Sequence, residues 1–270
     1  MQAMQQKNKT AFFIVTPSFN QAQFIRQTID SVLRQSGDFV IEYFVADGGS
    51  SDTTKEILKS FASKLSFVSE KDAGQTDAIN KGIAHFTSLQ ANYREIYFAY
   101  INSDDFYAPG AFSLVAKYFQ SHPAASWLAG DAKIIDAQGK EIQTVIRAYK
   151  QLLRKLFFLQ LLYILNPIPQ PAVFFRWEAI RSLGSFDNSL QYTMDYEYWL
   201  RAQQKLGKPI FLAKTLAAFR IHRESKGGSS FEGQFAEELQ VAKRYTTNSV
   251  LLALHSLHNA VILFIYRIIK

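Results

Sequence analysis

Two adjacent carboxylates, Asp104 and Asp105, directly follow an apolar run in the stretch YFAYINSDDFYAPG at 97–110. At the exit of a buried strand such acids repel each other and must be paired or desolvated. A hard divalent cation accepts carboxylate oxygens and can bridge to phosphate, which removes the repulsion. The structural alternative is that the acids cap the helix expected after Pro109. We favour a metal site facing a diphosphate.

Similar polar clusters follow three other apolar runs, at 16–18 (Thr-Pro-Ser), 47–49 (Asp-Gly-Gly) and 70–72 (Glu-Lys-Asp). The runs at 11–18, 39–49, 65–74 and 95–105 read as strands, and helical patterns follow at 21–37, 50–65, 75–86 and 109–123. This alternation predicts an α/β fold with a mostly parallel sheet and helices on both faces. Ligands bind at the carboxyl ends of strands in such sheets, so all four clusters should share one edge.

The helix starts have recognisable signals. Asn20 stands where an N-cap is expected, Thr53 and Glu56 are spaced as a capping box, and Pro109 is expected to open its helix.

After residue 125 the pattern becomes mixed. We expect two strands around a turn at 126–142, a helix with a basic stripe at 147–165, and extended chain at 166–175, where prolines forbid a helix. A helix at 193–207 and one or two strands at 208–222 should follow. We interpret residues 1–239 as one catalytic-type domain and 240–270 as a helical extension.

Asp47 ends a strand directly, so its carboxylate could accept hydrogen bonds from a base or a ribose. The turn after it is not a dinucleotide fingerprint, because no G-x-G-x-x-G follows the first strand, and no Walker loop is present. The segment EKDAGQTDAINKG offers four more polar residues: Asp72, Gln75, Asp77 and Asn80. We expect some of them to belong to the ligand site and the others to cap the helix at 75–86.

Asp195 lies near the start of an aromatic-rich helix, in YTMDYEYWLR. Either it interacts with the helix N-terminus, or its pKa is raised and it acts as a general base. His222 precedes a run at 226–230 that looks flexible enough to close over a ligand; the histidine is either structural or a third metal ligand.

The composition excludes some chemistry. The chain has 270 residues, a formal net charge of +7 and no cysteine, so disulfides and thiolate catalysis are excluded. No secretory signal is expected at the N-terminus. The C-terminal segment 250–266 has no fixed charge but contains polar residues, so a membrane-spanning helix is not favoured. This segment and the basic stripe at 147–155 are either ordinary core and solvated faces or, with the positive net charge, the surface of a protein that rests on anionic lipid.

The chain resembles inverting glycosyltransferases of family 2. The resemblance rests on ordered motifs over about 12–222: VTPSFNQAQFIRQTIDSVLRQ, VADGGSSDTTKEIL, SEKDAGQTDAINKG, INSDDFYAPGA, NPIPQPAVFFR and MDYEYWLR. It implies the GT-A fold, a single α/β domain that binds a nucleotide sugar.

The resemblance also implies residue roles. The donor would be bound by Thr16, Pro17, Ser18, Asn20, Asp47, Asp72, Gln75, Asn102 and Ser103. Asp104 would bind Mn²⁺ or Mg²⁺, with help from Asp105 because Asn102 replaces the first acid of the family motif. Asp195 matches the catalytic base, and His222 a late metal ligand of some members.

The expected reaction is transfer of a sugar, with inversion, from a nucleotide-diphosphate donor, UDP-sugar favoured, to an acceptor hydroxyl. The acceptor would be a glycan or lipid-linked glycan, as in cell-surface polysaccharide assembly. The expected location is the cytoplasm, peripherally at the inner face of the membrane, and no nucleic-acid partner is expected. A nucleotidyltransferase and a non-catalytic sugar-nucleotide-binding partner protein are the alternatives.

Overall fold

A computed structural model describes residues 9–223 and 231–269. These residues form two compact units. Unit 1 comprises Met1–Lys133, Pro169–Phe186 and Pro209–Phe219, and unit 2 comprises Ile134–Ile168, Asp187–Lys208 and Arg220–Lys270. The predicted division between 239 and 240 stays a prediction, and it falls inside helix α10 (Phe231–Tyr245).

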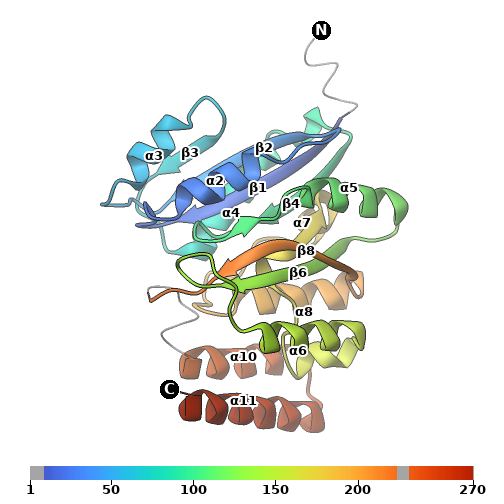
Figure 1. Cartoon of the computed structure of the whole chain (residues 1–270). Helices are drawn as coiled ribbons and strands as arrows, with labels where there is room; N and C mark the ends of the chain where they lie inside the picture. The colour runs from blue at the N-terminus through green and yellow to red at the C-terminus, as the bar shows by residue number, and fades with distance from the viewer. Residues whose placement is uncertain (1–8, 224–230, 270) are drawn as a thin grey trace. The chain divides into compact units, whose positions relative to one another are not determined.

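Unit 1 contains the sheet and the helices that cover it (Figure 1). Its strands are β1 (Thr10–Ser18), β2 (Val40–Asp47), β3 (Ser66–Ser69), β4 (Glu95–Tyr100), β5 (Phe106–Tyr107), β6 (Trp127–Ile135), β7 (Val173–Arg176) and β8 (Ile210–Arg220), of which β6 and β8 end in unit 2. Its helices are α2 (Ile25–Leu33), α3 (Thr54–Ser60), α4 (Gln75–Thr87), α5 (Ala111–Ser121) and α7 (Trp177–Leu183), with 3-10 turns η1 (Gln90–Asn92) and η3 (Gln170–Ala172).

The sheet has the order β3-β2-β1-β4-β7-β6-β8-β5. Strands β3, β2, β1 and β4 are parallel, as predicted. Strand β7 pairs antiparallel with both β4 and β6, and β5 pairs antiparallel with β8, so the complete sheet is mixed. The α/β class is confirmed, with the parallel strands forming one half of the sheet.

Alternate residues of β1 fill the two faces of the sheet, as a period of two requires. Phe12 stacks on Phe112 of α5, with ring centroids 4.5 Å apart. Phe13 points the other way and stacks on Phe86 of α4 at 4.5 Å, with Trp177 of α7 at its edge. Helices therefore cover both faces, as the alternating pattern predicted.

The predicted helix starts were wrong in detail. Asn20 lies at φ 52° in the loop before α2, whose N-cap is Phe24. Thr53 is the N-cap of α3 but makes no side-chain capping bond, so the capping box does not form; Asp52 Oδ1 instead accepts the Thr54 N–H at 3.0 Å. Helix α5 begins at Ala111 after Gly110, so Pro109 lies before the helix. The carboxylate of Asp52, rather than the hydroxyl of Thr53, therefore serves the start of α3.

Unit 2 is built mainly from helices: α6 (Thr144–Lys155), η2 (Leu159–Tyr163), α8 (Met194–Leu206), α10 and α11 (Ser249–Ile269). Polar contacts join them: His255 Nδ1 lies 2.9 Å from the Tyr163 carbonyl oxygen, and Gln203 Nε2 donates to the Leu159 carbonyl at 2.8 Å. Of the two strands expected at 126–142, β6 forms and the second reduces to a bridge between Ile135 and Glu141.

The helix expected at 147–165 is shorter than predicted, since α6 ends at Lys155 and the 3-10 turn η2 follows; its basic stripe is engaged inside unit 2. Arg147 pairs with Glu141, and buried Arg154 donates to the Pro167 carbonyl at 2.9 Å. Within the described ranges, none of the helices has the length and apolar composition needed to cross a bilayer.

Candidate functional site

The loops that follow β1 and β2 are joined by hydrogen bonds. The Asn20 N–H donates to Ser50 Oγ at 2.8 Å, and Asn20 Oδ1 accepts the Ser51 N–H at 2.9 Å. Asn20 thus uses its left-handed backbone and its amide to connect the two loops, in a conformation that asparagine tolerates better than most residues. Two of the predicted polar clusters therefore do lie together at one edge of the sheet.

Asp47 at the end of β2 is 1% exposed. Its carboxylate accepts the Ser50 N–H at 3.0 Å, the Ser50 hydroxyl, and the Ser69 hydroxyl at 2.7 Å. Three of its roughly four acceptor positions are therefore used within the protein. In this conformation Asp47 fixes the loop at 48–50 and connects β2 to β3. At most one acceptor position of its carboxylate is then left for a bound ligand.

Asp72 reaches the same loop. A Cβ placed on Gly48 would lie 2.9 Å from Asp72 Oδ1, so only glycine allows this approach. Asp72 Oδ1 also accepts the Gly74 N–H at 2.9 Å, and the side chain is partly exposed. Asp72 therefore stands beside the end of β2 with part of its surface open to solvent, as a donor-binding residue requires.

Other residues of this edge are buried. Thr16 is 0% exposed, and its hydroxyl lies 3.0 Å from the Tyr43 hydroxyl. Pro17 and Ser18 are buried as well. The three residues predicted as donor contacts thus lie inside β1, where their side chains support the edge.

A chain of amides crosses the parallel edge to the start of β7. Gln75 Nε2 donates to Asn102 Oδ1 at 2.7 Å, Asn102 Nδ2 donates to Gln170 Oε1 at 3.3 Å, and Gln170 Nε2 donates to the Tyr100 carbonyl at 3.0 Å. Asn102 is thereby oriented from both sides, and Gln170 enters the site. In contrast, Asp77 and Asn80 serve the scaffold, because Asp77 pairs with Lys81 and Asn80 bonds to the Phe186 backbone.

The residues after β4 alternate in exposure. Asn102 and Asp104 are partly exposed, whereas Ser103 and Asp105 are 4% and 1% exposed. Asn102 and Asp104 thus share the accessible side of the turn, with an amide and a carboxylate oxygen that suit Mn²⁺ or Mg²⁺. A metal shared with a diphosphate needs an accessible oxygen, so Asp104 is the better placed of the two acids.

Helix α2 supports the turn after β4 through hydrogen bonds to its backbone. Thr28 Oγ1 donates to the carbonyls of Ser103 and Asp105, at 2.8 and 2.6 Å. One turn further along the same face, Ser31 accepts the Tyr107 N–H, and Gln35, just after the end of α2, donates to the Ala108 carbonyl. Two polar groups on α2 and one directly after it therefore fix the backbone that carries Asp104.

Among residues 9–223 and 231–269, no three His, Asp or Glu side chains form a group that could hold a metal. Sites for Mg²⁺ commonly use one or two carboxylates and complete the shell with substrate phosphates, so Asp104 with Asn102 is chemically sufficient for that class. His222 is partly buried just after β8 and belongs to unit 2. The metal site of Asp104, Asp105 and His222 stays a prediction. The run at 226–230, expected to close over a ligand, lies outside the described residues.

Unit 2 contains a separate group of charged side chains around Asp195, the second residue of α8. Burial raises the pKa of Asp195 to about 6; the Tyr196 N–H, 2.7 Å from Oδ1, and Lys150 of α6 oppose the rise. Burial also raises the pKa of Glu238 on α10 to about 7, and Asp195 adds to that rise. A carboxyl group that titrates near neutral pH suits a general base.

Lys150 faces both acids. Burial lowers its pKa, and the charges of Glu238 and Asp195 oppose that effect. The sequence analysis identified Asp195 and the basic stripe but did not link them, and it did not select Glu238. Their encounter depends on the packing of three helices that are distant in the chain, so no local pattern could reveal it.

Comparison with known proteins gives a consistent result. Residues 13–177 match the profile described as Glycosyl transferase family 2. An uncharacterized glycosyltransferase of Rickettsia typhi is 26% identical over 77% of this chain and 63% of its own length. An uncharacterized protein of Mycobacterium tuberculosis is also 26% identical over 77% of this chain, and 58% of its length is covered. The chain thus spans about three fifths of these relatives.

Solved structures show the same fold. TarS 1-349 of S. aureus, in complex with UDP-GlcNAc, superposes with a TM-score of 0.65 at 18% identity, covering 89% of this chain and 67% of that one. A mannosyltransferase of Pyrobaculum calidifontis, in complex with GDP-Man and Mn²⁺, has a TM-score of 0.63 at 15% identity, with 97% and 80% covered. The fold is the GT-A fold, as the sequence motifs implied.

Proposed function

Because the chain belongs to glycosyl transferase family 2, we propose that it transfers a sugar, with inversion, from a nucleoside-diphosphate donor to an acceptor hydroxyl. The observation that carries the proposal is Asp104, a partly exposed carboxylate held at the carboxyl end of a central parallel strand. UDP is the favoured nucleotide, and the TarS structure with UDP-GlcNAc supports this choice.

The donor would lie along the edge formed by the loops after β1, β2, β3 and β4. Asp72 and Asn20 are accessible there, and Asn102 would offer its oriented amide to the ribose or diphosphate. Asp47, Thr16, Pro17 and Ser18 would support these groups from inside the edge, and Ser103 through its backbone. Asp104 would hold Mn²⁺ or Mg²⁺, which when bound neutralises charge on the diphosphate; the Mn²⁺ in the mannosyltransferase structure supports this assignment.

Asp195 would act as the general base. With a pKa near 6 it is mostly ionised at neutral pH yet retains enough proton affinity to take the proton from an attacking hydroxyl. The hydroxyl oxygen then forms the new bond at the anomeric carbon while the bond to the nucleoside diphosphate breaks on the opposite face. One displacement inverts the configuration, and no covalent enzyme intermediate is required.

A donor assay tests the proposal directly. The purified chain would be incubated with UDP-GlcNAc, UDP-glucose and GDP-mannose plus Mn²⁺, and release of free nucleotide followed with and without candidate glycan acceptors. Release of UDP or GDP that Asp104→Ala and Asp195→Asn abolish supports the transferase. Release of pyrophosphate from a nucleoside triphosphate and a sugar phosphate would instead identify a nucleotidyltransferase. Donor binding without turnover would identify a sugar-nucleotide-binding partner protein.

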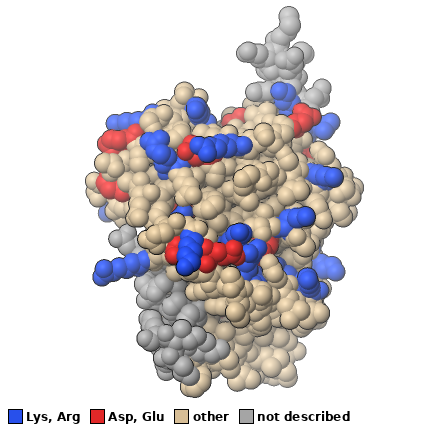
Figure 2. Space-filling model, in the orientation of Figure 1, with Lys and Arg blue, Asp and Glu red and all other residues tan. Residues whose placement is uncertain are grey.

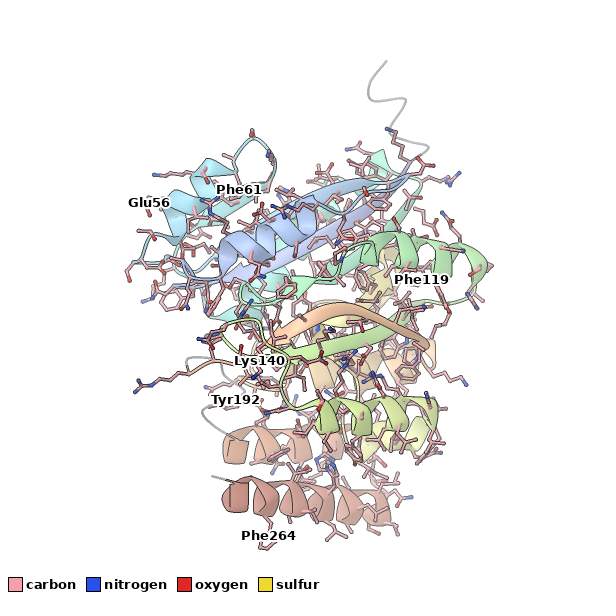
Figure 3. All side chains as sticks on the ribbon, viewed as in Figure 1. Glu56, Phe61, Phe119, Lys140, Tyr192 and Phe264 are labelled. Carbon is pink, nitrogen blue, oxygen red and sulfur yellow. The ribbon has the colours of Figure 1, made fainter. Side chains whose placement is uncertain are left out.

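We also propose that unit 2 contacts anionic lipid, which would place a lipid-linked glycan acceptor of polysaccharide assembly near the enzyme. Helix α6 exposes an apolar stripe at helical spacing: Val145 (80%), Tyr149 (42%), Leu152 (54%) and Leu156 (64%). Helix α11 exposes a second one: Val250, Leu254, Leu257, Val261 and Phe264. Figure 2 shows the described part of α11 as an uncharged surface, and Phe264 points outward in Figure 3.

The orientation of α11 argues for an apolar or interfacial partner. Two of its polar residues, His255 and Asn259, are buried, at 1% and 7% exposed, while Leu254, Leu257 and Val261 are exposed. Helix α6 contains no acidic residue, exposes Lys155 beside its apolar stripe, and belongs to a chain with a net charge of +7. An exposed apolar stripe can enter the membrane interface, and a neighbouring lysine and a positive net charge favour anionic headgroups.

Vesicle binding tests this contact. We expect sedimentation with vesicles that contain phosphatidylglycerol and weak binding to neutral phosphatidylcholine vesicles. Leu152→Glu with Leu156→Glu should abolish the binding, whereas Ala84→Glu, at an exposed position of α4, should not. Equal binding by both variants would refute the lipid surface. Self-association that the double variant removes would instead identify the surface as an interface between copies.

A further inference from the structure

We propose that Glu237 of α10 is a positioning residue that fixes the start of α8 and thereby the placement of Asp195. The inference rests on the proposed function, because it assumes that Asp195 is the base. Glu237 matches no motif of the sequence analysis, and it lies one residue before Glu238.

Glu237 receives four hydrogen bonds from three consecutive residues. Its Oε1 accepts the Gln191 N–H at 2.9 Å. Its Oε2 accepts the Tyr192 N–H at 2.7 Å, the Thr193 N–H at 2.9 Å and the Thr193 hydroxyl at 2.9 Å. These bonds lower the pKa of Glu237, although burial opposes them, so the side chain is a carboxylate at neutral pH.

The bonds converge on the start of α8, in which Thr193 is the N-cap. Its own hydroxyl makes no capping bond and donates to Glu237. A carboxylate at this position also interacts favourably with the positive end of the helix dipole. Glu237 therefore fixes the backbone that enters the helix two residues before Asp195, and with it the point from which the Asp195 side chain extends.

Glu237 also acts through its charge. Asp195 is faced by Lys150 from α6 and by Glu237 and Glu238 from α10, and the charge of Glu237 adds to the rise in the pKa of Asp195. On α11, His258 is close enough for Lys150 to lower its pKa, after the larger effect of burial. A neutral capping residue would satisfy the same N–H groups, whereas a carboxylate additionally holds Asp195 at a higher proton affinity.

The test compares the pH dependence of kcat in four proteins. Glu237→Gln removes the charge and replaces one acceptor oxygen with a donor that opposes a backbone N–H. We expect kcat to fall about 10- to 100-fold, KM for the donor to change less than about twofold, and the acid limb of the kcat profile to move to lower pH. Thr193→Val removes one of the four bonds and keeps the charge, so it should lower kcat by a smaller factor without moving the limb.

Asp187→Asn is the matched control. Asp187 lies in the same loop and pairs with Arg244 of the same helix α10 at 2.8 Å, without touching the start of α8. The pH profile of kcat for Asp187→Asn should equal that of the wild type. Amide hydrogen exchange over 191–196 should be faster in Glu237→Gln only.

Each outcome decides between explanations. A wild-type kcat and pH profile for Glu237→Gln, with Asp195→Asn inactive, would overturn this inference and leave the proposed function intact. Activity retained in Asp195→Asn would show that the base lies elsewhere and would remove the proposed mechanism itself. If Glu237→Gln fails to fold, the inference depends on Thr193→Val, and an unchanged kcat in that variant would overturn it.

Discussion

Replacing Asp195 with asparagine should stabilise the protein at neutral pH while it removes activity. Burial raises the pKa of Asp195 from its ordinary 3.8 to about 6. Above pH 6 the folded state therefore contains a carboxylate that is less well solvated than in the unfolded chain. Because a tenfold change in proton affinity corresponds to about 1.4 kcal/mol, the cost at pH 7.5 is at most about 3 kcal/mol.

The pH dependence of this effect has a definite sign. Below pH 3.8 the group is protonated in both states and costs nothing; its penalty grows between pH 3.8 and about 6 and is constant above that range. Asparagine is neutral throughout and keeps an oxygen for the Tyr196 N–H, which lies 2.7 Å from Asp195 Oδ1. The variant should thus gain about 1–3 kcal/mol of unfolding free energy at pH 7.5 and about half as much at pH 5.

Urea unfolding of both proteins at pH 7.5 and pH 5 measures the gain, and donor turnover at pH 7.5 measures the loss, expected to be about 10²–10⁴-fold. Donor affinity should be nearly unchanged. A destabilised variant at pH 7.5, or the same gain at both pH values, would refute the burial argument. Unchanged turnover would refute the assignment of the base, and weaker donor binding with normal turnover would point to a donor contact.

Three further predictions follow from the contacts. Lys150→Met removes a charge that holds the pKa of Asp195 down, so the acid limb of kcat should move to higher pH; an unmoved limb would contradict the pairing. Thr28→Val leaves two buried carbonyls without their donor and should lower the free energy of unfolding in urea by about 1–3 kcal/mol. A loss no larger than that of Thr87→Val, at an exposed position, would contradict the role of Thr28 in supporting the turn after β4. Gln170→Ala frees the amide of Asn102 and should raise KM for the donor about 2- to 10-fold with little change in kcat, which steady-state kinetics can measure.

The sequence predicted long, periodic elements well. The helix expected at 193–207 is α8, Met194–Leu206, because its apolar pattern and the following glycine are strong local signals. The parallel half of the sheet follows from the alternation of strands and helices. Strand β7 runs antiparallel, and a short apolar run such as AVFF contains no information on direction.

Some residues of the candidate site could likewise be predicted from the sequence, and others could not. Asp72, Asn102 and Asp104 were identified because they follow strands, and they do lie at the accessible edge. The hydrogen bond of Asp47 to Ser69 was not foreseeable, since Ser69 belongs to another strand. Gln170 and Glu237 act through partners about 70 and 45 residues away, distances at which a single sequence gives no pairing signal.

The central claim is that this edge binds a nucleoside-diphosphate donor with a divalent metal at Asp104. Calorimetric titration with UDP, GDP and dTDP, each with and without Mn²⁺, tests it most directly, with Asp104→Ala in parallel. We predict that one nucleotide, most favourably UDP, binds the wild-type protein in a Mn²⁺-dependent manner and that Asp104→Ala loses this dependence. A folded protein that binds none of the three nucleotides with Mn²⁺ would contradict the claim.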